Sequence, residues 1–269
     1  DVVRSYEAVH RVDLGKRKAT FFEIATAMAF EYFARQKVEW AVIETGMGGR
    51  FDATNIVTPR VSIITNLSIE HTDYLGNTIK ALAREKGGII KRNTPLVTAV
   101  SQPSGLAVLQ RLAEDNNAGM LAFKKDFSIR KENGRDRYTY RGLDQTFRGL
   151  EKPLPGEHQK QNLSLALAAC ELVFKRYGKQ DPRYRLTPGI IKDALSTVCW
   201  PGRLEHVQAD PLVILDGAHN LHASKVLKAH LEATLKEKKL TLVAGILDDK
   251  PYEKMLANLT ACAHRVILT

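Results

Sequence analysis

Short apolar runs alternate with amphipathic stretches along the first hundred residues. Residues 18–36 place apolar side chains around much of a helix, and the apolar run at 38–44 (VEWAVIE) predicts a buried strand. A second strand is predicted at 60–66, a helix at 77–88, and a third strand at 94–100. Strands that alternate with helices in this way are typical of a mainly parallel sheet covered on both faces.

Local signals support both predicted helices. Thr20 and Glu23 have the spacing of a capping box at the start of the first helix. Asn77 is the expected N-cap of the second helix, and Gly87–Gly88 follows its last turn, where glycine commonly ends a helix.

The middle of the chain changes character. Residues 126–142 alternate around Asn133–Gly134, a strong signal for a β-hairpin. Helices are predicted at 161–177 and 187–198, and Pro201–Gly202 is the best candidate for a linker.

Strand and helix patterns then alternate again. Strands are predicted at 212–216, 240–247 and 265–269, with helices from about residue 223 and at 252–263. We therefore predict an α/β protein with two domains. Residues 1–200 form a domain with a mainly parallel sheet, and residues 201–269 form the first part of a second, smaller α/β domain.

Composition bounds the class of protein. The 269 residues are 44% hydrophobic and 26% charged, as in soluble globular proteins. No apolar stretch has the length of a membrane span, and the start lacks the layout of a signal peptide. The three cysteines Cys170, Cys199 and Cys262 are odd in number and widely spaced, which favours a reducing compartment. We expect a cytoplasmic protein without a membrane partner.

The net charge of +10 fits a nucleic-acid surface or a cleft for anionic small molecules. Basic residues are densest at 16–18, 124–131 and 236–239, and none of these runs interleaves them with aromatic residues as a single-strand binder would. We therefore expect small-molecule substrates, no nucleic acid, and a monomer.

Polar clusters follow the predicted strands. Ligands of parallel sheets bind beyond the carboxyl ends of the strands, where loops and helix N-termini converge. Glu44 ends the first strand, His71 lies in the segment after the second, and residues 216–220 (DGAHN) follow the first strand of the second domain. Lys86 lies one helix beyond His71.

Each of these residues also has an ordinary structural interpretation. Glu44 can be a loop residue, His71 can belong to a turn, and Lys86 can be a cation favoured at a helix C-terminus. The remaining candidates can be ordinary helix caps or surface residues with no further role: Thr20, Glu23, Arg203 and Asp216–Asn220.

Four sequence blocks, taken together, resemble the folylpolyglutamate synthase / dihydrofolate synthase family of the Mur-ligase superfamily. The resemblance covers most of the chain. It implies that residues 1–200 are an ATPase-type domain that binds ATP and folate, and that residues 201–269 are the first part of a Rossmann-like ligase domain. The blocks are ETGMGGRFDATN (44–55), ITNLSIEHTDYLGNTIKALAREKGGIIK (64–91), PGRLE (201–205) and ILDGAHN (214–220).

This resemblance implies roles for individual residues. The implied catalytic residues are Lys86, His71, Glu44 and Arg203, of which Glu44 and His71 are magnesium ligands and Lys86 is carbamylated. Carbamylation would turn a cation that repels Mg²⁺ into a carboxylate that attracts it. The implied ATP contacts are Asn162, Arg203, Asp216 and His219. The implied pterin contacts are Thr20, Phe21, Phe22, Glu23, Phe51, Asp52 and Ala53.

The reaction implied by the resemblance is ATP-driven amide formation. A carboxylate of dihydropteroate or folate attacks the γ-phosphate, and the amine of L-glutamate displaces phosphate from the acyl phosphate. ATP is the co-substrate, and two Mg²⁺ ions with Arg203 would spread the negative charge.

Other functions remain open at this point. A related Mur-type ligase would act on cell-wall precursors, and a non-catalytic module would bind folate without consuming ATP. A nucleic-acid binder would show affinity that falls steeply with salt.

One expected motif is missing from the sequence. A glycine-rich phosphate loop ending in Gly-Lys-Ser or Gly-Lys-Thr should precede these blocks, and no such sequence is found in the chain. By comparison with the family we also expect the far end of the second domain to be missing, so we interpret the chain as the middle portion of a longer enzyme.

We therefore expect residues 1–269 alone not to turn over ATP, because no loop cradles the phosphates. The measurement is steady-state phosphate release by the purified chain with folate and glutamate. A sustained rate well above that of a sample lacking the protein would contradict the interpretation.

Overall fold

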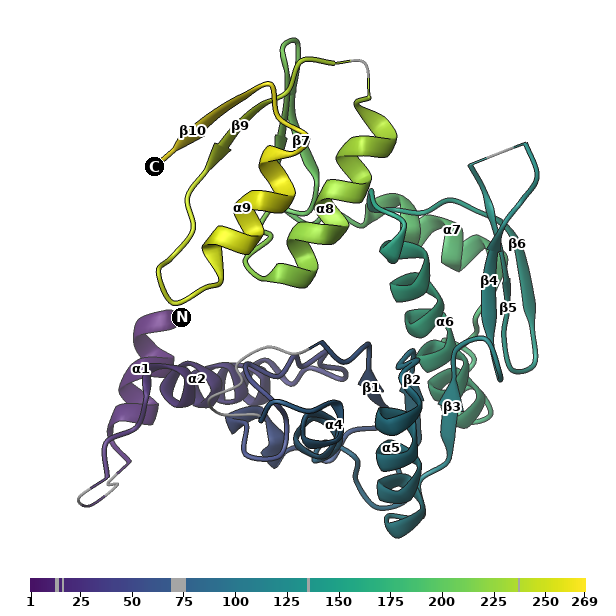
Figure 1. Cartoon of the computed structure of the whole chain (residues 1–269). Helices are drawn as coiled ribbons and strands as arrows, with labels where there is room; N and C mark the ends of the chain where they lie inside the picture. The colour runs from purple at the N-terminus through teal and green to yellow at the C-terminus, as the bar shows by residue number, and fades with distance from the viewer. Residues whose placement is uncertain (13–14, 16, 69–75, 135, 237) are drawn as a thin grey trace. The chain divides into compact units, whose positions relative to one another are not determined.

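The chain divides into two units, which we describe separately (Figure 1). One contains residues 1–96 and 101–120, and the other contains residues 97–100 and 121–269. The predicted domain boundary at residue 201 comes from the sequence pattern, whereas these units are groups of residues in contact. The division therefore does not test that boundary, which stays a prediction. The computed structural model describes residues 1–12, 15, 17–68, 76–134, 136–236 and 238–269.

Two helix pairs dominate the first unit. Helices α1 (Val2–His10) and α2 (Phe21–Gln36) pack together, as do α4 (Ile79–Gly87) and α5 (Pro103–Asp115). The Arg35 guanidinium joins the first pair, since it donates to the Asp1 carboxylate and the Ser5 hydroxyl, each at 2.9 Å. The sequence patterns predicted α2 and α4 but missed α1 and α5.

A sheet with strand order β1-β2-β3 follows the predicted parallel arrangement. Its strands are β1 (Ser62–Ile64), β2 (Leu96–Thr98) and β3 (Met120–Ala122). The Leu96 N–H bonds to the Gly119 carbonyl and the Phe123 N–H to the Thr98 carbonyl, each at 2.8 Å. From the first hydrogen bond to the second, the residue number rises on both strands, as it does in a parallel pair.

The strand predicted at 38–44 is not formed. These residues run between α2 and the next loop without pairing with any strand in the described part of the chain. Val42 is fully exposed, at 101% of its reference area. An apolar run becomes a buried strand only where a neighbouring strand takes its backbone groups, and the described residues supply none here.

The N-cap of α4 also differs by one residue from the expectation. Thr78, not Asn77, caps the helix, because its hydroxyl accepts the Ala81 N–H at 3.1 Å. Gly88 is the C-cap, as the glycine pair predicted, but its φ of −61° is right-handed.

An antiparallel sheet opens the second unit. Strands β4 (Ser128–Lys131), β5 (Tyr138–Arg141) and β6 (Thr146–Leu150) pack one face against helix α6 (His158–Tyr177). The predicted hairpin is confirmed, since Lys131 pairs with Tyr138 across the Asn133–Gly134 loop.

Glu171 on α6 anchors this sheet. The carboxylate is 5% exposed and accepts the Tyr140 hydroxyl at 2.7 Å, the Leu143 N–H at 2.9 Å and the Gln145 N–H at 3.2 Å. A Cβ on Gly142 would lie 2.0 Å from the same carboxylate. Burial, and then the hydrogen bond to Glu171, raise the pKa of the Tyr140 phenol.

The rest of the second unit returns to an α/β pattern. Helix α8 packs on α9, and the pair β9–β10 is parallel. Strand β7, which the sequence pattern did not predict, forms an antiparallel hairpin with β8. The elements are α7 (Pro188–Thr197), β7 (Glu205–Ala209), β8 (Leu212–Leu215), α8 (Leu221–Thr234), β9 (Thr241–Ala244), α9 (Tyr252–Thr260) and β10 (Arg265–Leu268).

The predicted α/β class with parallel sheets is thus confirmed. None of the described helices combines the length and apolar character needed to cross a membrane.

Replacing Glu171 tests the anchor. Glu171→Ala leaves three donors without their acceptor, so we expect it to lower the free energy of unfolding by about 3 kcal/mol, measured by urea denaturation. The control is Lys175→Ala, which removes only the exposed ion pair with Asp144 and should cost less than about 1 kcal/mol. Equal effects from the two variants would contradict the role assigned to Glu171.

Candidate functional site

The start of α2 carries the capping box that the sequence predicted. The Thr20 hydroxyl accepts the Glu23 N–H at 3.2 Å, and the Glu23 carboxylate accepts the Thr20 N–H at 2.7 Å. The backbone hydrogen bond from Thr20, and then its hydroxyl, lower the pKa of Glu23. Both side chains therefore have a structural task, in addition to any contact with a ligand.

A loop that follows Glu44 is organised by one carboxylate, that of Asp52. One oxygen accepts the Gly46 and Met47 N–H groups, each at 2.9 Å. The other accepts the Thr54 N–H at 2.9 Å and the Thr54 hydroxyl. Asp52 also caps the short 3₁₀ helix η1 (Ala53–Ile56).

These bonds set the ionisation of Asp52. Burial by itself would raise the pKa of the carboxyl group. The Thr54 hydroxyl and the backbone N–H groups of Met47, Thr54 and Gly46 outweigh burial, and the pKa is lowered. Asp52 is thus held as a carboxylate whose two oxygens are both occupied by the loop.

The same loop packs against the end of α4, backbone to backbone. The Arg50 N–H donates to the Glu85 carbonyl at 2.8 Å. A Cβ on Gly88 would lie 2.3 Å from the Cα of Arg50, and a Cβ on Gly49 would lie 2.9 Å from the carbonyls of Glu85 and Lys86. Only glycine permits so close an approach, which explains glycines on both sides of the contact.

The Asn55 amide closes the other end of the loop. Its Nδ2 donates to the Arg50 carbonyl at 3.0 Å and to the Gly88 carbonyl at 3.1 Å. The loop from Gly46 to Asn55 is therefore fixed to the helix that carries Lys86.

Two groups of expected pterin contacts meet at Gly46. A Cβ on Gly46 would lie 2.4 Å from the Phe22 ring, so the start of α2 lies against the loop. Phe21 and Phe51 are 86% and 83% exposed, and the Arg50 guanidinium lies 4.9 Å from the centre of the Phe51 ring. Exposed rings beside a rigid loop are available to stack on a flat heterocycle.

The expected metal ligands are described only in part. Glu44 lies exposed just before the loop, and Lys86 is half-buried in the last turn of α4. His71 lies outside the described residues. Among those that are described, no three His, Cys, Asp or Glu side chains gather as a metal site. The Glu44 carboxylate is nevertheless an oxygen ligand of the kind that Mg²⁺ takes.

The second unit contains the other expected residues, and Asp216 organises them. Its carboxylate accepts the Leu204 N–H at 3.0 Å and the Ala218 N–H at 2.9 Å. The Gly217 N–H donates to the Gly202 carbonyl at 2.8 Å. The segment with exposed Arg203 is thereby fixed beside the end of β8.

The loop that follows Asp216 leads into α8. His219 Nδ1 lies 3.0 Å from the Gly217 carbonyl, and the Asn220 side chain caps α8 by accepting the Ala223 N–H at 2.7 Å. The structure therefore brings Arg203, Asp216 and His219 together, and it confirms that Asn220 caps a helix.

Helix α6 contributes Asn162 and a residue that sequence reasoning missed, His158. Asn162 is exposed, and its amide donates to Gln159 at 3.0 Å. His158 lies one turn earlier, where a Cβ on Gly156 would come within 2.6 Å of its ring and 3.3 Å of Leu204. Burial lowers the pKa of His158, and Asp216 opposes this effect. The signal in the sequence was the glycine two residues before the histidine.

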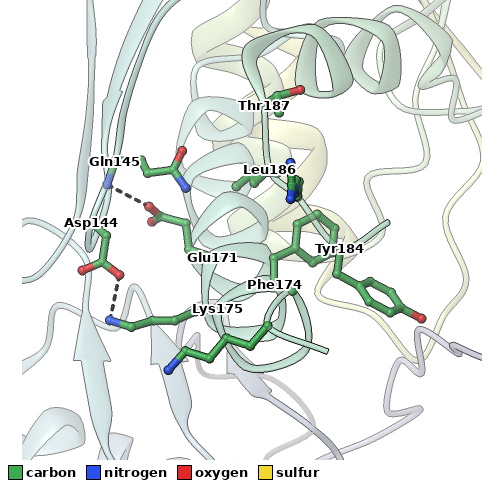
Figure 2. Close-up of a pocket in the computed structure, with 11 residues that line it drawn as sticks. Asp144, Gln145, Glu171, Phe174, Lys175, Tyr184, Leu186 and Thr187 are labelled. Atoms are coloured by element: carbon green, nitrogen blue, oxygen red, sulfur yellow. Dashed lines mark hydrogen bonds and ion pairs between the residues drawn. The ribbon is translucent and has the colours of Figure 1, made fainter. Parts of the chain in front are cut away.

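A separate pocket of about 410 Å³ lies between α6 and the turn that joins β5 to β6 (Figure 2). Glu171 and Lys175 project into it from α6, but Glu171 is occupied by the turn and Lys175 by Asp144 at 2.7 Å. None of the residues expected to bind ligands lines this pocket.

Family models match two parts of the chain. The Mur ligase middle domain matches residues 5–170, and the Mur ligase glutamate ligase domain matches residues 202–269.

Curated relatives carry names from folate metabolism. The dihydrofolate synthase/folylpolyglutamate synthase of Bacillus subtilis is 37% identical over 264 residues, which are 97% of this chain and 60% of that protein. The folylpolyglutamate synthase of Lacticaseibacillus casei is 38% identical and is matched by 93% of this chain, over 58% of its own length. The chain thus spans about 60% of the length of these relatives.

Solved structures agree with these relatives. An FPGS complex with AMPPCP and folate has a TM-score of 0.83 at 38% identity, covering 94% of this chain and 61% of that one. The folylpolyglutamate synthase of Mycobacterium tuberculosis complexed with ADP has a TM-score of 0.84 at 31% identity, covering 99% and 61%.

The role of Asp52 predicts a pH dependence for the loop. The pKa of Asp52 is lowered in the folded chain, so the carboxylate stabilises the folded loop fully above about pH 4. This stabilisation is lost as the pH falls through the folded-state pKa of Asp52. Asp52→Asn should speed amide exchange at Gly46, Met47 and Thr54 at least about tenfold at neutral pH, since charged acceptors are stronger.

The measurement is hydrogen exchange followed by mass spectrometry, with exposed Asp115→Asn as the control. Unchanged exchange in the Asp52 variant would contradict the role.

Proposed function

Because the chain belongs to the Mur ligase family, whose middle-domain model matches residues 5–170, we propose that it is part of an ATP-dependent glutamate ligase of folate metabolism. Its substrates are ATP, L-glutamate and either dihydropteroate or a folate. The relatives named dihydrofolate synthase and folylpolyglutamate synthase support this choice over a ligase for cell-wall precursors. We place the activity in the complete protein, in the cytoplasm, and propose that the enzyme is a monomer.

One observation carries the proposal: the loop with Asp52 is hydrogen-bonded to the end of α4 and lies against the Phe22 ring. Phe22 and Asp52, which are expected at the pterin, and Lys86, which is expected near the phosphates, then lie on neighbouring segments of the first unit. Positioning of this kind accounts for much of the catalysis in phosphoryl transfer.

The proposed division of labour in the first unit follows from side-chain chemistry. Phe21, Phe22 and Phe51 provide aromatic faces for the pterin, while Thr20, Glu23, Asp52 and Ala53 shape the surface beneath them. Glu44 and His71 would hold Mg²⁺, with carbamylated Lys86 as a further anion. The metal, when bound, would neutralise charge on the phosphates.

In the second unit, Arg203 is the cation for the γ-phosphate. Asp216 holds the Arg203 segment through the Leu204 N–H, and His219 lies on the same loop. Asn162 is the proposed contact for adenine. Arginine suits this role because its planar group binds phosphate oxygens in pairs and remains charged at neutral pH.

The carbamylation of Lys86 is open to a direct test. In the complete enzyme, Lys86→Arg keeps a cation near the phosphates but removes the amine that reacts with carbon dioxide. We expect kcat to fall by at least about 100-fold, because a positive charge replaces a negative one at the reacting centre. The assay measures incorporation of labelled glutamate into folate and, separately, into dihydropteroate.

The matched control is Lys80→Arg, an exposed position in the first turn of the same helix, which should leave kcat within about twofold. Full activity of Lys86→Arg would contradict the role of Lys86. Absence of glutamate incorporation by the unmodified complete enzyme with either acceptor would contradict the proposed function.

A further inference from the structure

The antiparallel sheet β4–β5–β6 has an outer face that none of the roles above uses. Directly paired residues of antiparallel strands point to the same face. Ile129 pairs with Tyr140 and Tyr140 with Phe147, and all three are buried, so they form the inner face. The outer face contains the residues between them along each strand.

Arginines from all three strands gather on this outer face. Arg130 pairs directly with Thr139, and Arg141 lies two residues beyond Thr139 on the same strand. Arg148 lies two residues beyond Thr146, which pairs with Arg141. All three arginines are exposed, and they line a hollow of about 450 Å³ together with Thr139 and Thr146.

Two cations at the rim of the sheet have ion-pair partners, unlike the three outer arginines in the described part of the chain. Within the described part of the chain, Lys131 pairs with Asp136 at 3.0 Å and Arg137 with Glu151 at 3.2 Å, while the three arginines take part in no ion pair. The nearby Glu132 carboxylate accepts the Thr139 hydroxyl at 2.7 Å and the Gly149 N–H at 2.8 Å. Like charges on neighbouring strands repel one another, and a bound anion would relieve that repulsion.

The chemistry of the hollow narrows the class of anion. Guanidinium groups bind carboxylates and phosphates through two parallel hydrogen bonds. Binding of single-stranded nucleic acid relies on aromatic side chains that stack on bases, and no aromatic residue is among the described residues that line the hollow. The hollow thus suits an anion with several carboxylates or phosphates better than a single-stranded nucleic acid.

We infer that Arg130, Arg141 and Arg148 form a binding site for the γ-linked oligoglutamate tail of a folate. The identity of the ligand rests on the proposed function, which lengthens such a tail by one carboxylate in each cycle. The three guanidinium groups belong to adjacent strands, so they can engage more than one carboxylate of the tail at once.

A fluorescein-labelled tri-γ-glutamate peptide without a pteridine tests the site on the 269-residue chain, by fluorescence anisotropy at about 0.15 M salt. The triple variant Arg130→Gln, Arg141→Gln, Arg148→Gln should weaken binding at least about tenfold. The matched control removes the same charge elsewhere, through the exposed Arg92→Gln, Arg111→Gln and Arg265→Gln, and should change the Kd by less than about twofold. Thermal unfolding checks each variant, and Arg141→Gln alone replaces the triple variant if that one unfolds.

Equal weakening by the two triple variants would overturn the inference, since binding would then depend only on net charge. Tighter binding of tripolyphosphate or of a short RNA to the same arginines would overturn it as well. The peptide needs neither ATP nor turnover, so its binding is independent of ligase activity. If the complete enzyme ligates glutamate but the 269-residue chain does not bind the peptide, the inference is overturned and the proposed function is unaffected.

Discussion

The contact between the 46–55 loop and the end of α4 is the constraint on which the candidate site in the first unit depends. It is a contact between backbones, and glycine on both sides makes it possible, at Gly49 and at Gly88. The backbone hydrogen bond and the close glycine contacts hold the loop at the end of α4. The Asp52 carboxylate then keeps the loop in one conformation by accepting N–H groups from both ends of it.

A second aspartate has a similar role in the other unit. Asp216 accepts the N–H groups of Leu204 and Ala218 and so joins the segment with Arg203 to the end of β8. In both loops an aspartate side chain accepts hydrogen bonds from backbone N–H groups of the loop. Ligand-binding side chains nearby can then remain exposed without making the loop mobile.

Buried charge elsewhere in the chain is used for architecture. Glu171 joins α6 to the turn between β5 and β6, and its hydrogen bonds explain why a carboxylate is tolerated at 5% exposure. The net charge of +10 adds up charged groups that lie in different environments. The role of each group depends on the residues close to it. Arg137 is paired with Glu151 at the rim of a sheet, whereas the outer arginines of the same sheet have no ion-pair partner among the described residues.

The sequence by itself determined the α/β class, the hairpin at Asn133–Gly134 and the capping box at Thr20, because periodicity, turns and caps depend on neighbours along the chain. The family resemblance, rather than periodicity, identified the residues of the candidate site. The tertiary structure decided which distant segments lie together, because the spacing of residues along the chain does not contain that information. The run at 38–44 is no strand, because a strand needs a partner that its own pattern does not provide. Leu204 lies close to Gly156, Phe22 lies against Gly46, and three arginines share one face, because residues far apart in sequence meet only when the chain folds.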